Sequence, residues 1–255
     1  MKKVRVPNSV LVCISILILI GLWVYASAMQ PKFFPSPAAV FERLQKMIER
    51  PIGKTSVLGH VWISLQRVLI AMACSSVLGI LTGLAMGWND KARAVISPLF
   101  TSLRPIPPIA WIPLVILWFG VGEFPKVLLI FIGSYFIVGL NTMAGVAMVE
   151  PMYIQVGRVY KARGWNMLRH IVFPAATPAI IAGLKIALGS AWMVVVAAEM
   201  IASKSGLGFL ITRGSDSGDT PLVLIGMILI GVVGAIISYL FSLLERRLCP
   251  WMVKD

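Results

Sequence analysis

The stretch EPMYIQVGRVYKARGWNMLRHIVFPAATP, residues 150–178, is the longest polar interruption in the C-terminal two-thirds of an otherwise apolar chain. It is basic, with no acidic residue after Glu150. Pro151 suits the first turn of a helix, where its missing N–H has no partner to lose, and Gly164 permits a break before a second helical stripe. We predict a helix–turn–helix at a membrane surface that presents a short amphipathic helix outward. An ordinary cytoplasmic loop whose arginines only set the topology is the alternative.

The composition predicts an all-α, polytopic membrane protein. Of 255 residues, 58% are hydrophobic and only 13% are charged, and several apolar runs approach the roughly 20 residues that span a bilayer. The net charge of +13 comes from basic residues in short loops, which favours anionic lipid and topology signals over nucleic acid. Three scattered cysteines and two distant histidines indicate neither a disulfide framework nor a metal site.

About six membrane-spanning helices are expected, with both termini in the cytoplasm. Lys2, Lys3 and Arg5 precede the first run, Ser9–Met29, and place the N-terminus inside. A cleavable signal is the alternative, because Ala26-Ser27-Ala28 resembles a cleavage site, but the run exceeds the usual signal core of about 7–15 residues. The remaining predicted spans are Val68–Trp88, Ala110–Gly120, Val127–Met148, Ala179–Ile201 and Pro221–Leu244.

The connections between these spans carry further expectations. Pro37–Arg50 is predicted to be a short outer amphipathic helix, and His60–Arg67 an amphipathic lead-in to the second span. Asn89–Arg93 is expected to be an inner loop, and residues 120–126 an outer turn. Ser203–Thr220 is expected to be a polar outer stretch, and the sixth span is expected to stop at Glu245-Arg246-Arg247.

Three glycines in the second predicted span mark a packing face. Gly79, Gly83 and Gly87 follow one another at a spacing of four residues. Small residues repeated at this spacing allow a second helix to approach closely in a membrane. The alternative is that these glycines have no special role, because glycine is common in membrane helices. The strict spacing of four residues favours a packing role.

Prolines and lone charges suggest where solute passes. A regular helix cannot continue through RPIPPIAWIP, residues 104–113, and irregular backbone at membrane depth persists only inside protein or beside a wet cavity. Lys185 and Glu199 are ionisable residues within one apolar run, about 21 Å apart along a helix, and each has either a functional role or a buried structural bond. The predicted translocation path or gate comprises Arg104, Pro105, Pro107, Pro108, Trp111, Ser134, Asn141, Lys185 and Glu199.

The sequence contains none of the common catalytic or nucleotide-binding motifs. The sequence contains no G-x-x-x-x-G-K-[ST] phosphate loop, no H-E-x-x-H and no G-x-S-x-G. We therefore predict no catalytic residue, no metal ligand and no cofactor on the chain itself.

The segment QVGRVYKARGWNMLRHIVFPAATP (155–178) resembles the coupling motif of binding-protein-dependent ABC importer permeases, EAA-x3-G-x9-I-x-LP. Ile171 and Pro174 match outright, Lys161 stands at the glycine position, and Gly164 is the substitute turn glycine three residues later. Further segments resemble the sulfonate, taurine and nitrate branch of these permeases: FFPSP (33–37), SLQRVL (64–69), RPIPPIAWIPLVILWFGVGE (104–123), GLKIALGSAW (183–192), VAAEMIA (196–202) and GLG (206–208).

This resemblance implies the type I, MetI-like permease fold, in two parts. Residues 1–57 would form the N-terminal transmembrane helix and a periplasmic amphipathic segment, and residues 58–255 the permease core with coupling loop 150–178. The implied residues for coupling to an ATPase are Gln155, Val156, Gly157, Arg158, Val159, Tyr160, Lys161, Arg163, Gly164, Ile171 and Pro174.

The resemblance also implies partners. These are ABC ATPase subunits that hold ATP and Mg, a second permease copy, and a periplasmic or lipid-anchored solute-binding protein, in the lipid of a bacterial inner membrane and without nucleic acid. The solute would be a sulfonate, taurine, nitrate or a related small anion or precursor. Two alternatives stay open: an ion-coupled secondary transporter or channel that acts without an ATPase, and a membrane anchor that moves no solute. Lone charges in place of clustered ion ligands, and no evident inverted repeat, disfavour the first.

Overall fold

The computed structural model describes residues 8–30 and 33–249, and its regular elements within these ranges are helical. The predicted all-α class is confirmed. The elements are α1 (Asn8–Met29), α2 (Pro37–Glu49), α3 (Val57–Trp88), α4 (Asp90–Leu103), η1 (Pro108–Trp111), α5 (Ile112–Phe119), α6 (Glu123–Ala147), α7 (Pro151–Val159), α8 (Trp165–Met167), η2 (Leu168–Val172), α9 (Phe173–Ala202), α10 (Leu207–Asp216) and α11 (Thr220–Leu248).

Four helical segments of the described chain are long and apolar enough to cross a membrane: α3, α6, α11, and the segment Trp165–Ile201 that includes α9. The pair formed by α4 and the η1–α5 segment counts as a fifth span only if it is taken together, because it is bent by 87°. The apolar part described in α1, Cys13–Met29, is shorter. The expected six spans are therefore reached only by counting both the bent pair and α1.

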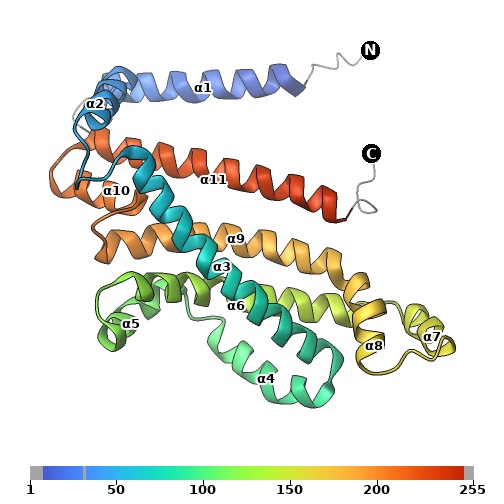
Figure 1. Ribbon diagram of the computed structural model, residues 1–255. Helices are drawn as coiled ribbons and strands as arrows, with labels where there is room; N and C mark the ends of the chain where they lie inside the picture. The colour runs from blue at the N-terminus through green and yellow to red at the C-terminus, as the bar shows by residue number, and fades with distance from the viewer. Residues whose placement is uncertain (1–7, 31–32, 250–255) are drawn as a thin grey trace, which may run out of the picture.

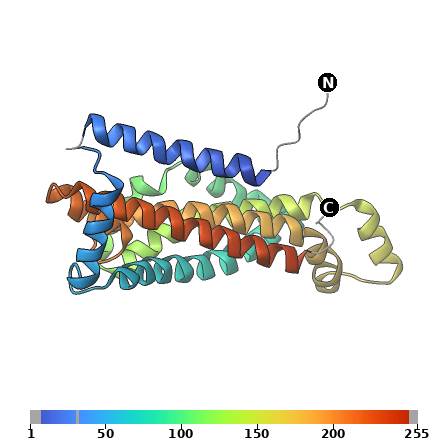
Figure 2. The ribbon, with the colours of Figure 1, turned by 90° about the horizontal axis from the view of Figure 1, so that it is seen from above.

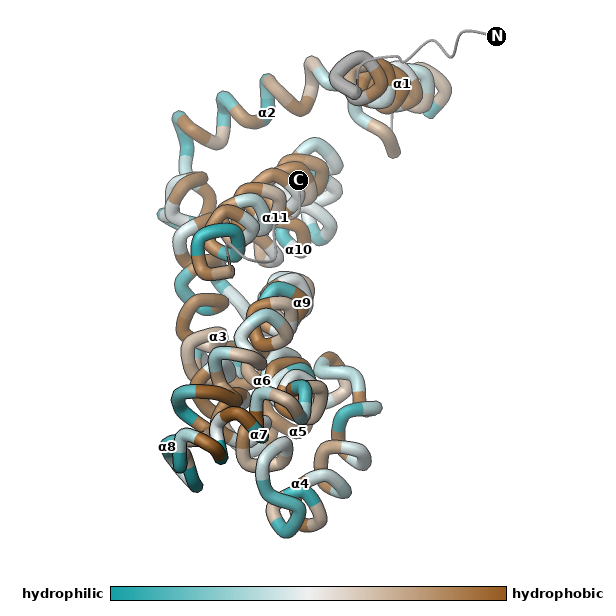
Figure 3. The backbone as a smooth tube through the Cα atoms, turned by 90° about the vertical axis from the view of Figure 1, so that its right-hand side faces the viewer, coloured by the Kyte–Doolittle hydropathy of each residue, from teal (hydrophilic) through white to brown (hydrophobic). Residues whose placement is uncertain are grey.

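The long helices run side by side, with α7 and α8 at one end and α2, α5 and α10 at the other (Figures 1 and 2). We call these the α7 end and the α10 end. The Asn8 end of α1 and the Leu248 end of α11 both point toward the α7 end (Figure 1). Helix α1 stands apart from the bundle, and α2 bridges the space between them (Figure 3).

The proline-rich stretch produces a sharp bend. Helix α4 ends at Leu103, the chain turns through Arg104–Pro107, and α5 is only eight residues long. The predicted break in this stretch is confirmed, because prolines remove the backbone N–H donors that a continuous helix needs. The predicted span over Ala110–Gly120 is wrong, because the eight residues of α5 are too short to cross a bilayer.

Helix α4 begins in a stretch that was predicted to be an inner loop. The side-chain oxygen of Asn89 accepts hydrogen bonds from the backbone N–H groups of Lys91 and Ala92, at 2.9 and 3.3 Å. This cap starts a helix at Asp90, so the loop predicted over Asn89–Arg93 is wrong. In contrast, the predicted Pro37–Arg50 helix is confirmed as α2, with Ser36 as its cap.

Three more predicted boundaries differ from those in the structure. The polar stretch Ser203–Thr220 contains α10, and the outer turn 120–126 is shortened because α6 starts at Glu123. The last helix runs through Glu245–Arg247 to Leu248, since Arg and Glu are strong helix formers. The lead-in predicted over His60–Arg67, by contrast, is confirmed, because it runs without a break into the second span as part of α3.

Helix α9 begins at Phe173, before the predicted start of the fifth span at Ala179, and includes Pro174 and Pro178. Pro174 lies in its first turn, and the backbone N–H of Phe173 bonds to the carbonyl of Leu168, five residues back. This wider π-type turn accommodates the chain before a residue that has no N–H.

The glycine row of α3 lies against α6. A Cβ atom at Gly83 would stand 2.5 Å from both the carbonyl oxygen of Gly139 and the Cβ of Thr142. One at Gly87 would stand 2.5 Å from the Cβ of Val146. Only glycine lets the backbones of these two helices approach so closely.

Candidate functional site at the α7 end

Helix α7 forms as its sequence predicts, with Pro151 in its first turn. The chain then turns between α7 and α8. The backbone N–H of Ala162 bonds to the carbonyl of Gly157 at 2.9 Å, and Lys161 and Gly164 adopt positive φ angles of 60° and 52°. Lys161 therefore holds a left-handed conformation at the position where the coupling motif expects glycine, which costs a non-glycine residue about 1–2 kcal/mol.

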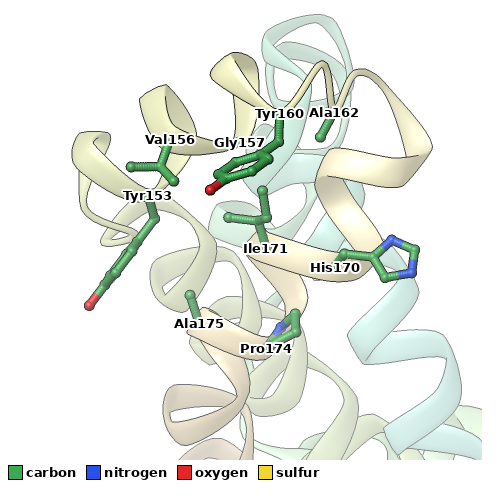
Figure 4. A pocket seen from close by; sticks show the side chains of 9 residues that line it. All are labelled: Tyr153, Val156, Gly157, Tyr160, Ala162, His170, Ile171, Pro174 and Ala175. Atoms are coloured by element: carbon green, nitrogen blue, oxygen red, sulfur yellow. The ribbon is translucent and has the colours of Figure 1, made fainter.

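An apolar cavity of about 680 Å³ lies between α7 and the start of α9. Figure 4 shows the side chains around it. Gly157 is buried at its base, where a side chain would collide with Ile171 and Met167. The residues that line the cavity are Tyr153, Val156, Gly157, Tyr160, Ala162, His170, Ile171, Pro174 and Ala175.

The turn exposes two large apolar side chains. Tyr160 and Val159 are 83% and 80% exposed, respectively. Large exposed apolar side chains on a short, rigid helix are typical of a protein-binding surface. The arrangement can receive a partner protein.

The structure divides the eleven predicted coupling residues among different faces of α7 and the following turn. Five of them line the apolar cavity: Val156, Gly157, Tyr160, Ile171 and Pro174. Four line two further hollows beside α3: Gln155, Arg158, Arg163 and Gly164. Val159 and Lys161 line none of these three hollows.

The nine predicted path residues do not form one cluster. Ser134 and Asn141 donate hydrogen bonds to carbonyls of their own helix, Ile130 and Ile137 respectively. Lys185 pairs with Glu245 on α11 at 2.7 Å, whereas Glu199 lies near the other end of α9. Arg104 follows α4, Pro105 and Pro107 occupy the bend, and Pro108 and Trp111 begin and end η1.

Glu199 makes the buried structural bond that the sequence left open as one alternative, but the polar network around it at the α10 end was not predicted. Arg67 on α3 donates to Glu199 and to Glu123, both at 2.6 Å, and to the carbonyl of Ser205 at 3.0 Å. Lys126 pairs with Glu123 at 2.9 Å. The signal was available, because an arginine inside an apolar helix needs a carboxylate partner.

The same network builds the start of α10. His60, Ser64 and Glu199 accept hydrogen bonds from the backbone N–H groups of Gly206, Leu207 and Gly208, which open that helix. These three acceptors satisfy donors that a helix start leaves unpaired. Residues from α3 and α9 thus fix α10 in place.

The described residues contain no cluster of side chains that could bind a metal ion. Within residues 8–30 and 33–249, no three His, Cys, Asp or Glu side chains lie close enough together to hold a metal ion.

Comparison with known proteins defines the class. The profile of the family described as binding-protein-dependent transport system inner membrane component matches residues 75–253. The taurine transport system permease protein of Escherichia coli is 34% identical over 98% of this chain and 93% of its own length. The nitrate import permease protein of Synechocystis is 30% identical, over 96% and 90% respectively.

A solved inward-facing structure of a methionine ABC transporter gives a TM-score of 0.68 at 16% identity. It covers 75% of this chain and 95% of the matched chain, which shows the shared fold. The chain belongs to the family of binding-protein-dependent transport system inner membrane components, the permeases of ABC importers. The expected all-α, MetI-like permease fold and the expected family are confirmed, whereas the cytoplasmic position of both termini stays a prediction.

Proposed function

We propose that this chain forms the translocation path of an ATP-driven importer in a bacterial inner membrane, for a small anion of the taurine, sulfonate or nitrate kind. The observation that carries the substrate class is the 34% identity to a taurine permease across almost the whole chain. The permease works with separate ATPase subunits, which hold ATP and Mg, and with a solute-binding protein that delivers the anion.

The ATPase docks at the α7 end. Its anchors are the apolar side chains of Val156, Val159 and Tyr160, which are 46%, 80% and 83% exposed. Because Gly157 packs tightly against Met167 and Ile171, a push on α7 reaches η2 and the start of α9. Nucleotide-driven closure of the ATPase would therefore tilt a spanning helix.

A second copy of the chain completes the path. Leu117 and Trp118 are 79% and 61% exposed, and they lie near the end of α5, the short helix that follows the proline bend and η1. Exposed apolar side chains beside an irregular segment suit a contact with a second permease, since such a segment needs to be buried in protein. The path then runs between the two copies, along the bend and the faces of α6 and α9.

Solute choice resides mainly in the binding protein. The polar side chains Ser134 and Asn141 on α6 are occupied by backbone carbonyls, so they offer no dense set of ligands to an anion. Exchanging the binding protein for one of different specificity, with the same docking surface, would redirect transport.

The test is uptake by reconstituted vesicles that contain the permease, its ATPase and its binding protein. We expect labelled taurine or nitrate to enter only with ATP and with the binding protein. ATP depletion at a constant proton gradient would abolish this uptake. Uptake that persists without ATP would identify a secondary transporter and overturn the proposal.

A further inference from the structure

We propose that the side of α7 facing α3 binds the phosphate-bearing headgroup of an anionic membrane phospholipid. Two hollows, of about 470 and 300 Å³, lie on this side and share Trp88, Ile154 and Arg158. Arg93 and Gln155 line the larger hollow, and Arg163 lines the smaller one. We call the two together the basic hollow.

The charge of the basic hollow fits an anion. Its lining contains three arginines and no acidic residue. The guanidinium of Arg93 is held in place by bonds to the carbonyls of Met86 and Gly87, at 2.9 and 3.1 Å. Arg93 also forms a long ion pair of 3.8 Å with Asp90, whose side chain is fully exposed and lines neither hollow.

The other two arginines are available to a ligand. Among residues 8–30 and 33–249, the guanidinium groups of Arg158 and Arg163 form no hydrogen bond and no ion pair with another side chain or carbonyl. A planar guanidinium is the group that best matches phosphate oxygens. One fixed and two unpaired guanidiniums therefore surround a space lined by the amide of Gln155.

The position of the basic hollow at the membrane surface favours a lipid headgroup over a free anion. It lies where two spans end, beside Trp88 at the end of α3 and beside Val146 and Ala147 at the end of α6. Tryptophan is enriched at this level of the bilayer. Apolar side chains of Ile154 and Val149 line the same space, which suits a molecule with both a phosphate and hydrocarbon.

With a lipid bound here, α7 would contact two different partners on two of its sides. The apolar cavity and the exposed turn face the proposed ATPase, whereas Arg158 and Gln155 face the lipid headgroup. A headgroup in the basic hollow would hold α7 against the ends of α3 and α6. Lipid composition would thereby influence how firmly the helix transmits a push.

The test measures lipid binding to the purified permease alone, in detergent, by native mass spectrometry. The probes are phosphatidylglycerol, phosphatidylcholine and inorganic phosphate. We expect phosphatidylglycerol to bind in preference to phosphatidylcholine. Arg158→Gln should weaken this binding about fivefold, because each arginine near an anionic surface raises the affinity by roughly that factor. The double variant Arg158→Gln with Arg163→Gln should weaken it about 25-fold, because the two effects are independent. Arg158→Lys should keep most of the affinity.

The matched control is Arg169→Gln, which removes the same charge from an exposed residue of η2 that lines neither hollow. It should change the affinity less than twofold. Equal losses in Arg158→Gln and Arg169→Gln would overturn the site, and so would displacement of the lipid by inorganic phosphate at low millimolar concentration. If lipid binding is unchanged in Arg158→Gln, and a separate pull-down titration shows that this variant has lost ATPase affinity, the lipid site is overturned and the hollow belongs to the partner protein. Because the assay contains no ATPase, binding protein or solute, its failure is distinct from a failure of the proposed transport function.

Discussion

The guanidinium of Arg67 on α3 donates a hydrogen bond of 2.6 Å to the carboxylate of Glu199 on α9, 132 residues further along the chain. Their side chains are 3% and 0% exposed. A second carboxylate, Glu123 at the start of α6, accepts from the same guanidinium at 2.6 Å. One arginine therefore joins three spanning helices at the α10 end.

Removing this arginine should strongly destabilise the protein. Arg67→Met leaves the buried carboxylate of Glu199 without its cation, and breaking a buried pair in this way costs about 3–5 kcal/mol. We expect a clear fall in the Tm of the purified protein in detergent. The control is Lys46→Met, because Lys46 pairs with Glu42 at the same 2.6 Å distance but both side chains are largely exposed.

The exposed pair should contribute little. The hydrogen bond from Lys46 lowers the pKa of the Glu42 carboxyl, yet water screens both groups. Lys46→Met should leave the Tm unchanged within error. Similar Tm shifts in the two variants would show that burial does not decide the importance of the Arg67 network.

The α3–α6 contact should be intolerant of a single methyl group. The Cβ of Gly83→Ala would meet the backbone of Gly139, which cannot move aside as a side chain can, so we expect a loss of about 1–3 kcal/mol of unfolding free energy. Gly231→Ala on α11 is the control, because no atom lies within 4 Å of the added methyl. Denaturation in detergent would compare them, and equal stability would remove the packing role of the glycine row.

The turn after α7 offers a test of the motif alignment. Gly164 has φ 52° and ψ −123°, a conformation that a β-branched residue adopts only with strain. Lys161→Gly instead relieves a left-handed lysine. In the reconstituted complex, Gly164→Val should reduce solute-stimulated ATP hydrolysis more than Lys161→Gly does. The opposite ranking would mean that residue 161, and not 164, is the essential turn position.

Tyr160 should be an anchor for the ATPase. It is 83% exposed, and truncating an interface anchor typically costs about 1–4 kcal/mol, which weakens affinity about ten- to several-hundred-fold. Tyr160→Ala should release the ATPase in a pull-down titration while the permease still inserts. Tyr239→Ala on α11, where the tyrosine is 66% exposed, is the control and should bind normally. Unchanged affinity in Tyr160→Ala would exclude this residue from the interface.

Local signals in the sequence were sufficient for part of this structure. Pro37 and Pro151 mark helix starts, and the proline cluster at 105–108 marks the bend, because each acts through its own backbone chemistry. The glycine spacing likewise identified the face of α3 that meets α6. These features depend on residues within one or two turns of each other.

Long-range contacts determined what the sequence did not reveal. Helix α10 forms in a stretch expected to be polar loop because His60, Ser64 and Glu199 satisfy its first N–H groups from elsewhere in the chain. The partner of Glu199 is not on its own helix but on α3. The division of the predicted coupling residues between opposite sides of α7 also required the positions of α3 and α9.

In the proposed transporter, the ATPase binds at the α7 end of the permease. Cysteine cross-linking in a background lacking Cys13, Cys74 and Cys249 tests this directly. Val159→Cys places a thiol on the exposed turn, and Leu58→Cys places one at the opposite end of the molecule with nearly the same exposure, 79% against 80%. We predict an adduct between the permease and its ATPase for Val159→Cys and none for Leu58→Cys. No adduct at residue 159, or equal adducts at both residues, would contradict the account.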